Sequence, residues 1–427
     1  MMENLQRVQP PVFPVEKVVI PEAKSFRLNN GIPVYIIEAG TENIMRVEFV
    51  FRAGQVKEYL PMLASTCNMM LSEGSENYTS EELNRLLDFY GVFLNQSAEK
   101  DSAGIVLFFL NKHIEKVLEF SREILFRPVF PEAELNSLMR KRLRWYLVNR
   151  EKVQNLAIDK FFESLFGKDH PYGYQITEQD FDHLKSSHLF DFHQRHYTPE
   201  NMAIIISGRV HEDTIELLDS FFGNMDIKPV LKEDNSVSFN NGKVKKIHIT
   251  KSGTVQNAIR IGSATINKRH PDYIGLKVVD SILGGYFGSR LMKNIREEKG
   301  YTYGISSSLS SLDLSGYKVI STEVGQKYYQ KTIDEIYKEI RLLQNNPVTN
   351  EELAVVRNYM SGEMVRMFDG PFALAESFKS AWEFGLDNSY YYRMAEKIKT
   401  IDADEITELA KTYYNIYDLY EVTVGAE

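Results

Sequence analysis

The chain repeats one order of elements in its two halves, and this repetition restricts the fold more than any other feature. In each half, short apolar runs typical of strands stand beside long amphipathic patterns typical of helices. Each half closes with a short strand-like run that ends in a glycine, at 204–208 and again at 420–425. Two halves of like order predict a duplicated unit of roughly 200 residues.

The periodic pattern fails between the halves, over residues 226–246. The runs at 232–235 and 240–243 are polar and rich in turn-forming residues, which is typical of a linker. We therefore predict two domains, residues 1–228 and 229–427. Strands grouped beside long helices predict an α+β architecture, in which helices cover one face of each sheet.

The composition is that of a globular protein, with 43% hydrophobic and 26% charged residues. A net charge of -9 argues against non-specific binding to nucleic acid or to anionic membranes. No run is long enough to span a membrane and the N-terminus does not resemble a signal peptide, so we expect a cytoplasmic location. The single cysteine, Cys67, excludes an internal disulfide, and we expect it to be a small buried apolar side chain.

The segment 289–304 combines a helix pattern with a strand pattern. Its first part has apolar residues three and four apart, which form one face of a short helix. Gly300 stands where a helix C-terminus needs a left-handed residue, and the residues after it favour a strand. This pattern places Arg296 in the last helical turn and Tyr303 on the following strand, close to each other.

An arginine and a tyrosine presented together suit the binding of a peptide carbonyl that gains negative charge, because both side chains donate directed hydrogen bonds. The alternative is structural: Arg296 neutralises its helix C-terminus and Tyr303 is a half-buried strand aromatic. Spacing alone favours this alternative. Spacing also leaves Tyr301 open as the donor, since it shares a strand face with Tyr303.

The second half resembles the C-terminal-half signature of the M16 metallopeptidases, the pitrilysin and mitochondrial processing peptidase family. The matching residues are Gly284-Gly285, Ser289-Arg290-Leu291, Ile295-Arg296-Glu297, Lys299-Gly300, Tyr303 and Pro347–Leu353. The first half matches at Asn30-Gly31, Ala53-Gly54, Glu73-Gly74-Ser75, Gly91, His170–Gly173 and Tyr197–Met202. The resemblance covers almost the whole chain and implies the LuxS/M16 metallohydrolase-like fold, with two homologous sheet-plus-helix halves. It also selects Tyr303 over Tyr301.

Active members of that family carry His-x-x-Glu-His on a helix of the first half, where the histidines bind zinc and the glutamate is the base. The resemblance aligns Ser65 and Met69 with the histidines and Asn68 with the glutamate. The third ligand, a glutamate in the family, falls in the region around Trp145, which has no glutamate. A hydroxyl, a thioether and an amide do not replace these groups. We therefore expect no metal and no cofactor in this chain.

Four other residues have a spacing that allows metal binding. His193 and His196 are three apart on a predicted helix, near His188 and Asp191. We expect solvated or locally hydrogen-bonded side chains here, because this helix reads as a surface helix. A self-contained metalloenzyme that uses these four residues is the least favoured of the alternatives.

The loss of the zinc motif together with retention of Arg296 and Tyr303 is the pattern of the non-catalytic subunit in heterodimeric M16 peptidases. The resemblance then implies a partner, an M16 homologue with an intact His-x-x-Glu-His, which holds the zinc. This chain would contribute the two side chains and half of a chamber for a peptide substrate, and would not be active alone. The alternatives are a purely structural or peptide-binding subunit, and a homodimer in isolation.

The resemblance also implies a place for the peptide. Family members bind peptide as an added strand on a sheet edge, and the matching segment here includes Phe93, Leu94, Asn95 and Gln96. An ordinary sheet strand explains this segment equally well.

Overall fold

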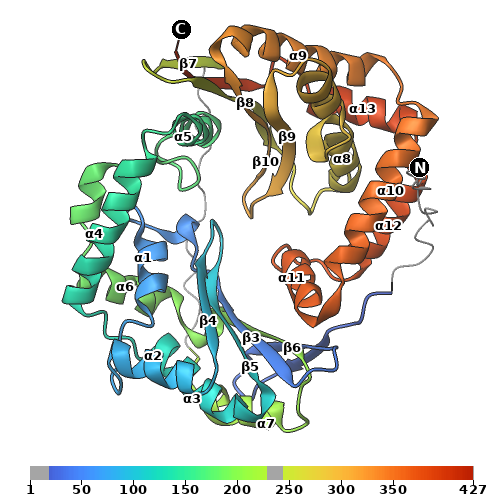
Figure 1. Ribbon diagram of the computed structural model, residues 1–427. Coiled ribbons are helices and arrows are strands. Elements are labelled where there is room, and N and C mark those ends of the chain that lie inside the picture. The colour runs from blue at the N-terminus through green and yellow to red at the C-terminus, as the bar shows by residue number, and fades with distance from the viewer. Residues whose placement is uncertain (1–18, 228–243, 427) are drawn as a thin grey trace, which may run out of the picture.

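The computed structural model describes residues 19–227 and 244–426, which form two sheets with helices packed beside each (Figure 1). This confirms the predicted α+β architecture with one sheet in each half. The predicted domain boundary between residues 228 and 229 lies outside the described residues. Among the described helices, none combines the length and the apolar content needed to cross a bilayer.

The first half contains six strands and seven α-helices of the described chain. The strands are β1 (Lys24–Arg27), β2 (Pro33–Glu38), β3 (Ile44–Phe51), β4 (Phe93–Ala98), β5 (Ala103–Leu110) and β6 (Met202–Gly208). The helices are α1 (Leu63–Met70), α2 (Ser80–Phe89), α3 (Ile114–Phe126), α4 (Glu132–Asn149), α5 (Val153–Phe166), α6 (Ser186–His196) and α7 (Thr214–Leu218). The sheet has the order β1-β2-β6-β3-β5-β4, so β4 is an edge strand.

The second half contains five strands and six α-helices of the described chain. The strands are β7 (Lys246–Thr250), β8 (Gln256–Thr265), β9 (Thr302–Ser311), β10 (Gly316–Gly325) and β11 (Tyr420–Gly425). The helices are α8 (Tyr273–Asp280), α9 (Tyr329–Asn345), α10 (Asn350–Met367), α11 (Gly370–Trp382), α12 (Ser389–Thr400) and α13 (Ala403–Tyr413). Two π-helical segments, η6 (Ser281–Gly285) and η7 (Met292–Glu298), precede β9. The sheet order is β7-β11-β8-β10-β9, with β9 at the edge.

The closing strands of the two halves pair in the same way. β6 runs parallel to β2 and antiparallel to β3, while β11 runs parallel to β7 and antiparallel to β8. A tyrosine before each closing strand contacts a polar residue near the end of a helix: Asn68 Nδ2 donates to Tyr197 Oη at 3.1 Å, and Tyr414 Oη donates to Asp280 at 2.8 Å. These parallels confirm the repeat predicted from the sequence.

Local sequence signals explain several element ends. Gly31 has φ +92° in the turn between β1 and β2, which pair antiparallel as predicted. The Thr79 side chain caps α2 in a capping box with Glu82. Gly300 has φ +63° after η7, the left-handed conformation that the sequence predicts there.

One helix of each half packs on the sheet of the other half (Figure 1). Helix α5 of the first half packs on β8 and β11, with Phe161 and Leu165 buried against Val422. Helix α11 of the second half packs on β2 and β6, where Tyr35 lies 5.0 Å from Phe378 between ring centroids. The two halves are therefore interlocked by apolar contacts.

The two faces of β3 differ in chemistry. One face carries apolar side chains that pack in the core of the first half. The other face carries Arg46 and Glu48, which are 0% and 2% exposed. Arg46 donates to Glu48 at 2.7 Å and also to Glu376, and Lys379 of α11 donates to Glu48 at 2.6 Å. An ionic cluster, in which the β3 members are buried and Glu376 is exposed, therefore joins the halves.

Candidate functional site

The structure places the two motif residues together, as predicted. Arg296 lies in η7 and donates from Nε to the main-chain oxygen of Tyr303 at 2.9 Å. Its guanidinium carbon lies 4.6 Å from the ring centroid of Phe287. The helical segment is π-helical, in which Lys299 N–H bonds to the Asn294 oxygen five residues earlier, so its last turn is wider than in the predicted helix.

The environments of the two tyrosines differ. Tyr303 is 93% exposed at the start of the edge strand β9. Tyr301 stacks on Tyr328 with 4.7 Å between ring centroids. The hydroxyl of Tyr303 therefore faces solvent and is accessible to a ligand, whereas the Tyr301 ring packs against its own chain. Neither Arg296 nor Tyr303 lines the central cavity that the described residues form.

Three residues of α1, Ser65, Asn68 and Met69, align with the zinc motif, and their surroundings differ. Asn68 is 1% exposed and donates from Nδ2 to the Gly104 oxygen at 3.0 Å. Met69 is 45% exposed, and Ser65 donates to the Met62 oxygen at 3.1 Å. Asn68 is thus a core hydrogen-bonding residue rather than a group held near a metal.

Arg142 of α4 forms hydrogen bonds with this part of α1. Its guanidinium donates to Thr66 Oγ1 at 2.6 Å and to Ser65 Oγ at 3.0 Å. Trp145, the position aligned with the third ligand, is 69% exposed. No sequence pattern marks Arg142, although its position three residues before Trp145 places it one helical turn away.

A carboxylate lies at the N-terminus of α1. Glu58 accepts hydrogen bonds from Ala64 N–H at 2.8 Å and from the Tyr174 hydroxyl at 2.5 Å. Burial raises the pKa of Glu58 to about 6, although these hydrogen bonds oppose the shift. Burial lowers the pKa of Arg142, and the charge of Glu58 opposes that shift. Tyr174 directly follows the His-Pro-Tyr-Gly motif, and this adjacency is the one signal that could have pointed to it.

These residues do not fit a zinc ion. Zinc needs lone pairs from nitrogen, sulfur or carboxylate ligands in a tetrahedral set. The guanidinium beside Ser65 offers donors but no lone pair. Among the described residues, no group of three or more histidine, cysteine or acidic side chains is arranged to hold a metal. Cys67 is buried in the core, as predicted.

The alternative set on α6 does not form a metal site. His193 donates from Nε2 to the Leu125 oxygen at 2.7 Å, His188 accepts from Lys185 N–H at 3.3 Å, and Asp191 accepts from Arg195 at 2.9 Å. The expectation of local hydrogen bonds is correct, but the expectation of a surface position is wrong for two of the histidines. His193 and His196 are 7% and 6% exposed, and His193 packs against Leu125 and Phe130. Burial lowers the pKa of His193 to about 4.

Strand β4 has one free edge, because it pairs with β5 alone in the described sheet. Phe93 is 66% exposed, and Asn95 lines the central cavity. Leu94 packs against the core, and Gln96 donates to the Asn68 oxygen at 2.5 Å. The four predicted residues thus alternate between the cavity side and the α1 side, and the free edge can accept another strand.

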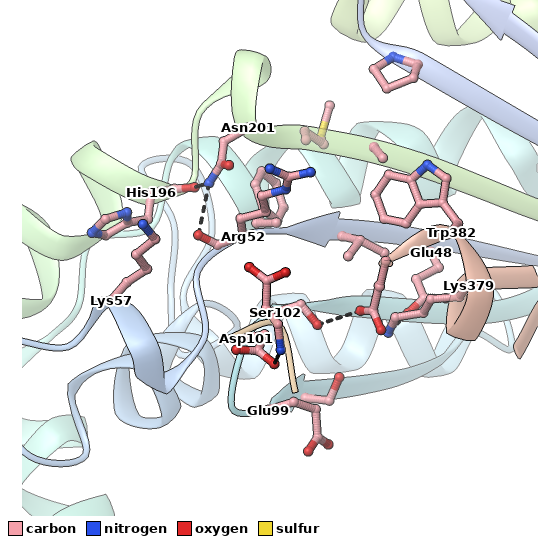
Figure 2. A pocket seen from close by; sticks show the side chains of 18 of the residues that line it. Glu48, Arg52, Lys57, Glu99, Asp101, Ser102, His196, Asn201, Lys379 and Trp382 are labelled. Atoms are coloured by element: carbon pink, nitrogen blue, oxygen red, sulfur yellow. Dashed lines mark hydrogen bonds and ion pairs between the residues drawn. The ribbon is translucent and has the colours of Figure 1, made fainter. Parts of the chain in front are cut away.

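A cavity of about 1630 Å³ lies between the halves, larger than typical small-molecule sites (Figure 2). Its wall carries both signs of charge, from Glu48, Arg52, Lys57, Glu99, Asp101 and Lys379. Hydrogen bonds cross between the halves at this wall, from Ser102 Oγ to Glu383 at 2.7 Å, from Asp313 N–H to Asp101 at 2.8 Å and from Lys379 to Glu48 at 2.6 Å. The cavity is a chamber built from both halves, and its wall combines charged with apolar side chains.

Replacing the buried carboxyl tests this part of the site. Glu58 has a folded-state pKa of about 6 against a usual 4.5, so its stabilising contribution is complete below pH 4.5 and is lost as the pH rises through 6. Glu58→Gln is expected to raise the free energy of unfolding at pH 7 by up to about 2 kcal/mol and to change little near pH 4. Urea unfolding at both pH values measures this, with exposed Glu38→Gln as the control. Equal effects at both pH values would contradict the assignment.

Comparison with known proteins adds family information. Residues 183–360 match the family model described as "Peptidase M16 inactive domain". The chain is 23% identical over 301 residues to "Uncharacterized zinc protease YmxG" of Bacillus subtilis, covering 69% of this chain and 72% of that protein. It is 21% identical to "Non-peptidase homolog YmxG" of Helicobacter pylori, covering 84% of this chain and 83% of that protein. "Probable inactive metalloprotease YmfF" of Bacillus subtilis is 19% identical, with 82% and 86% covered.

Two solved structures share the fold over nearly the whole chain. The crystal structure of a peptidase M16 inactive domain from Pseudomonas fluorescens has a TM-score of 0.85 at 20% identity, covering 95% of this chain and 98% of that chain. The crystal structure of a protease from Helicobacter pylori has a TM-score of 0.84 at 16% identity, covering 95% and 100%. At these identities the likeness shows the fold, which confirms the expected M16-like architecture.

Proposed function

Because this chain is a homologue of the M16 peptidases and does not carry their zinc-binding motif, we propose that it is the non-catalytic subunit of a heterodimeric M16-type zinc peptidase. One observation carries the proposal: the zinc ligands are replaced, while Arg296 and a solvent-exposed Tyr303 remain together. The partner would be an M16 homologue that holds the zinc through an intact His-x-x-Glu-His.

The chemistry assigned to this chain is hydrogen-bond donation. The Tyr303 hydroxyl would donate to the substrate carbonyl oxygen as negative charge develops on it. Arg296 holds the main chain of Tyr303 through the 2.9 Å hydrogen bond and would place the remaining guanidinium donors beside the substrate backbone. The high exposure of Tyr303 supports a role toward another molecule, since its side chain contributes little to the core of its own chain.

The second role is to hold peptide. The free edge of β4 and the chamber wall lie together at Asn95 and Ser97, which belong to both. A peptide added to β4 would therefore run along the chamber. This observation favours a second candidate function, a peptide-binding subunit that takes no part in catalysis.

Reconstitution tests the proposal. The purified chain alone, supplied with zinc, is expected to leave a quenched-fluorescent peptide library uncut. Mixed with a zinc-bearing M16 homologue from the same genome, it should form a complex and raise cleavage above the sum of the separate proteins. Complex formation without any gain in cleavage would favour the peptide-binding or structural function. Cleavage by this chain alone would overturn both.

A further inference from the structure

The resemblance to the M16 peptidases implies that the metal of an active homologue would lie near the contact between α1 and α4. In such a protein the first motif histidine on α1 and a residue of the long helix share one ion. Here the equivalent α1 position is Ser65, and its hydroxyl oxygen lies 3.0 Å from a terminal nitrogen of Arg142 on α4. The same guanidinium bonds Thr66 at 2.6 Å, so it bridges the two helices with two hydrogen bonds.

The charge pattern around this contact also suits a cation. The carboxylate of Glu58 is fixed at the N-terminus of α1 by Ala64 N–H and the Tyr174 hydroxyl. The charge of Glu58 favours the charged form of Arg142 on α4, while the cation that acts most on Glu58 itself is Lys100. Arginine stays charged in such surroundings and prefers fixed, directional acceptors, which the two α1 hydroxyls provide.

We propose that the guanidinium of Arg142 has replaced the metal ion in this protein, taking over both its positive charge and its bridging of α1 to α4. The chain is thereby committed to a metal-free state, and this holds whether or not a partner subunit exists. A zinc ion at this place would meet a like charge within contact distance and would find no lone pair on Arg142. Restoring the motif histidines alone is then insufficient to restore zinc binding.

Zinc binding by engineered full-length chains tests the proposal. Zinc alone is the probe, and its stoichiometry and affinity are measured after gel filtration. Ser65→His with Met69→His is expected to bind no stoichiometric zinc. Adding Arg142→Gln should tighten zinc binding by roughly tenfold or more, and adding Arg142→Glu instead should give one zinc per chain.

The matched control for these variants is Arg144→Gln, on the exposed side of the same helix. Added to the two histidine substitutions, it should leave zinc binding as weak as before. Equal zinc affinity with Arg142 intact and replaced would overturn the proposal.

A second measurement covers the case in which the histidine variants do not fold. In the otherwise native chain, Arg142→Gln should speed amide hydrogen exchange across 63–70 by roughly tenfold, because the charged hydrogen bonds from α4 are lost. Arg144→Gln should leave this exchange unchanged. Unchanged exchange in the Arg142 variant would show that Arg142 does not bridge the helices, contrary to the proposal.

Discussion

Tyr303→Phe is expected to lower the turnover of the reconstituted peptidase by roughly a hundredfold to a thousandfold, the usual effect of removing one donor to a developing oxyanion. The substitution removes one hydroxyl from a side chain that is 93% exposed, so the fold should not change. Single-turnover kinetics on the assembled complex measure the effect, because they separate the chemical step from peptide binding.

Tyr301→Phe is the matched control for this prediction. It removes the same atom two residues away, from a ring that is stacked on Tyr328. The control should turn over at close to the native rate. Arg296→Ala should also lower the rate, since the main chain of Tyr303 loses its 2.9 Å hydrogen bond. Native turnover in both Tyr303→Phe and Arg296→Ala would remove the assigned roles and leave the peptide-binding or structural function.

Glu48→Ala is expected to lower the free energy of unfolding by about 3–5 kcal/mol, the usual result of removing one partner from a buried ion pair. Glu48 accepts hydrogen bonds from both Arg46 and Lys379, and its side chain is 3% exposed. Its removal leaves Lys379 of α11 without its carboxylate partner on β3. Urea unfolding at neutral pH measures the loss.

The control for Glu48 is an ion pair at the surface. Glu38→Ala removes the partner of Lys24, and these side chains are 55% and 62% exposed. Exposed pairs contribute roughly 0–1 kcal/mol, so this variant should unfold almost as the native chain does. A similar small loss for Glu48→Ala would show that the buried cluster does not hold the halves together.

Local signals in the sequence predicted the elements and the motif well. The hairpin at Gly31, the cap at Thr79 and the left-handed Gly300 depend on a few neighbouring residues, and all three are confirmed. The juxtaposition of Arg296 and Tyr303 also follows from one turn of chain. These features could be read because the residues that cause them are adjacent in the sequence.

Contacts between segments that are distant in the sequence could not be predicted from local patterns. The contact between Ser65 and Arg142 joins residues 77 apart, and no local pattern marks an arginine that replaces a metal. The burial of His193 depends on its contacts with Leu125 and Phe130, which are more than 60 residues earlier in the chain, whereas its helix alone reads as a surface helix.

The packing of α11 on the first sheet has a consequence for synthesis on the ribosome. The first sheet is complete once β6 has emerged, but the helix that covers its β2 and β6 strands is encoded only at Gly370–Trp382. During translation this surface, which includes Tyr35, stays bare while residues 209–382, more than a third of the polypeptide, are being made. Nascent chains with such uncovered apolar surface are prone to aggregation, so chaperones are expected to act on this protein until its C-terminal part arrives.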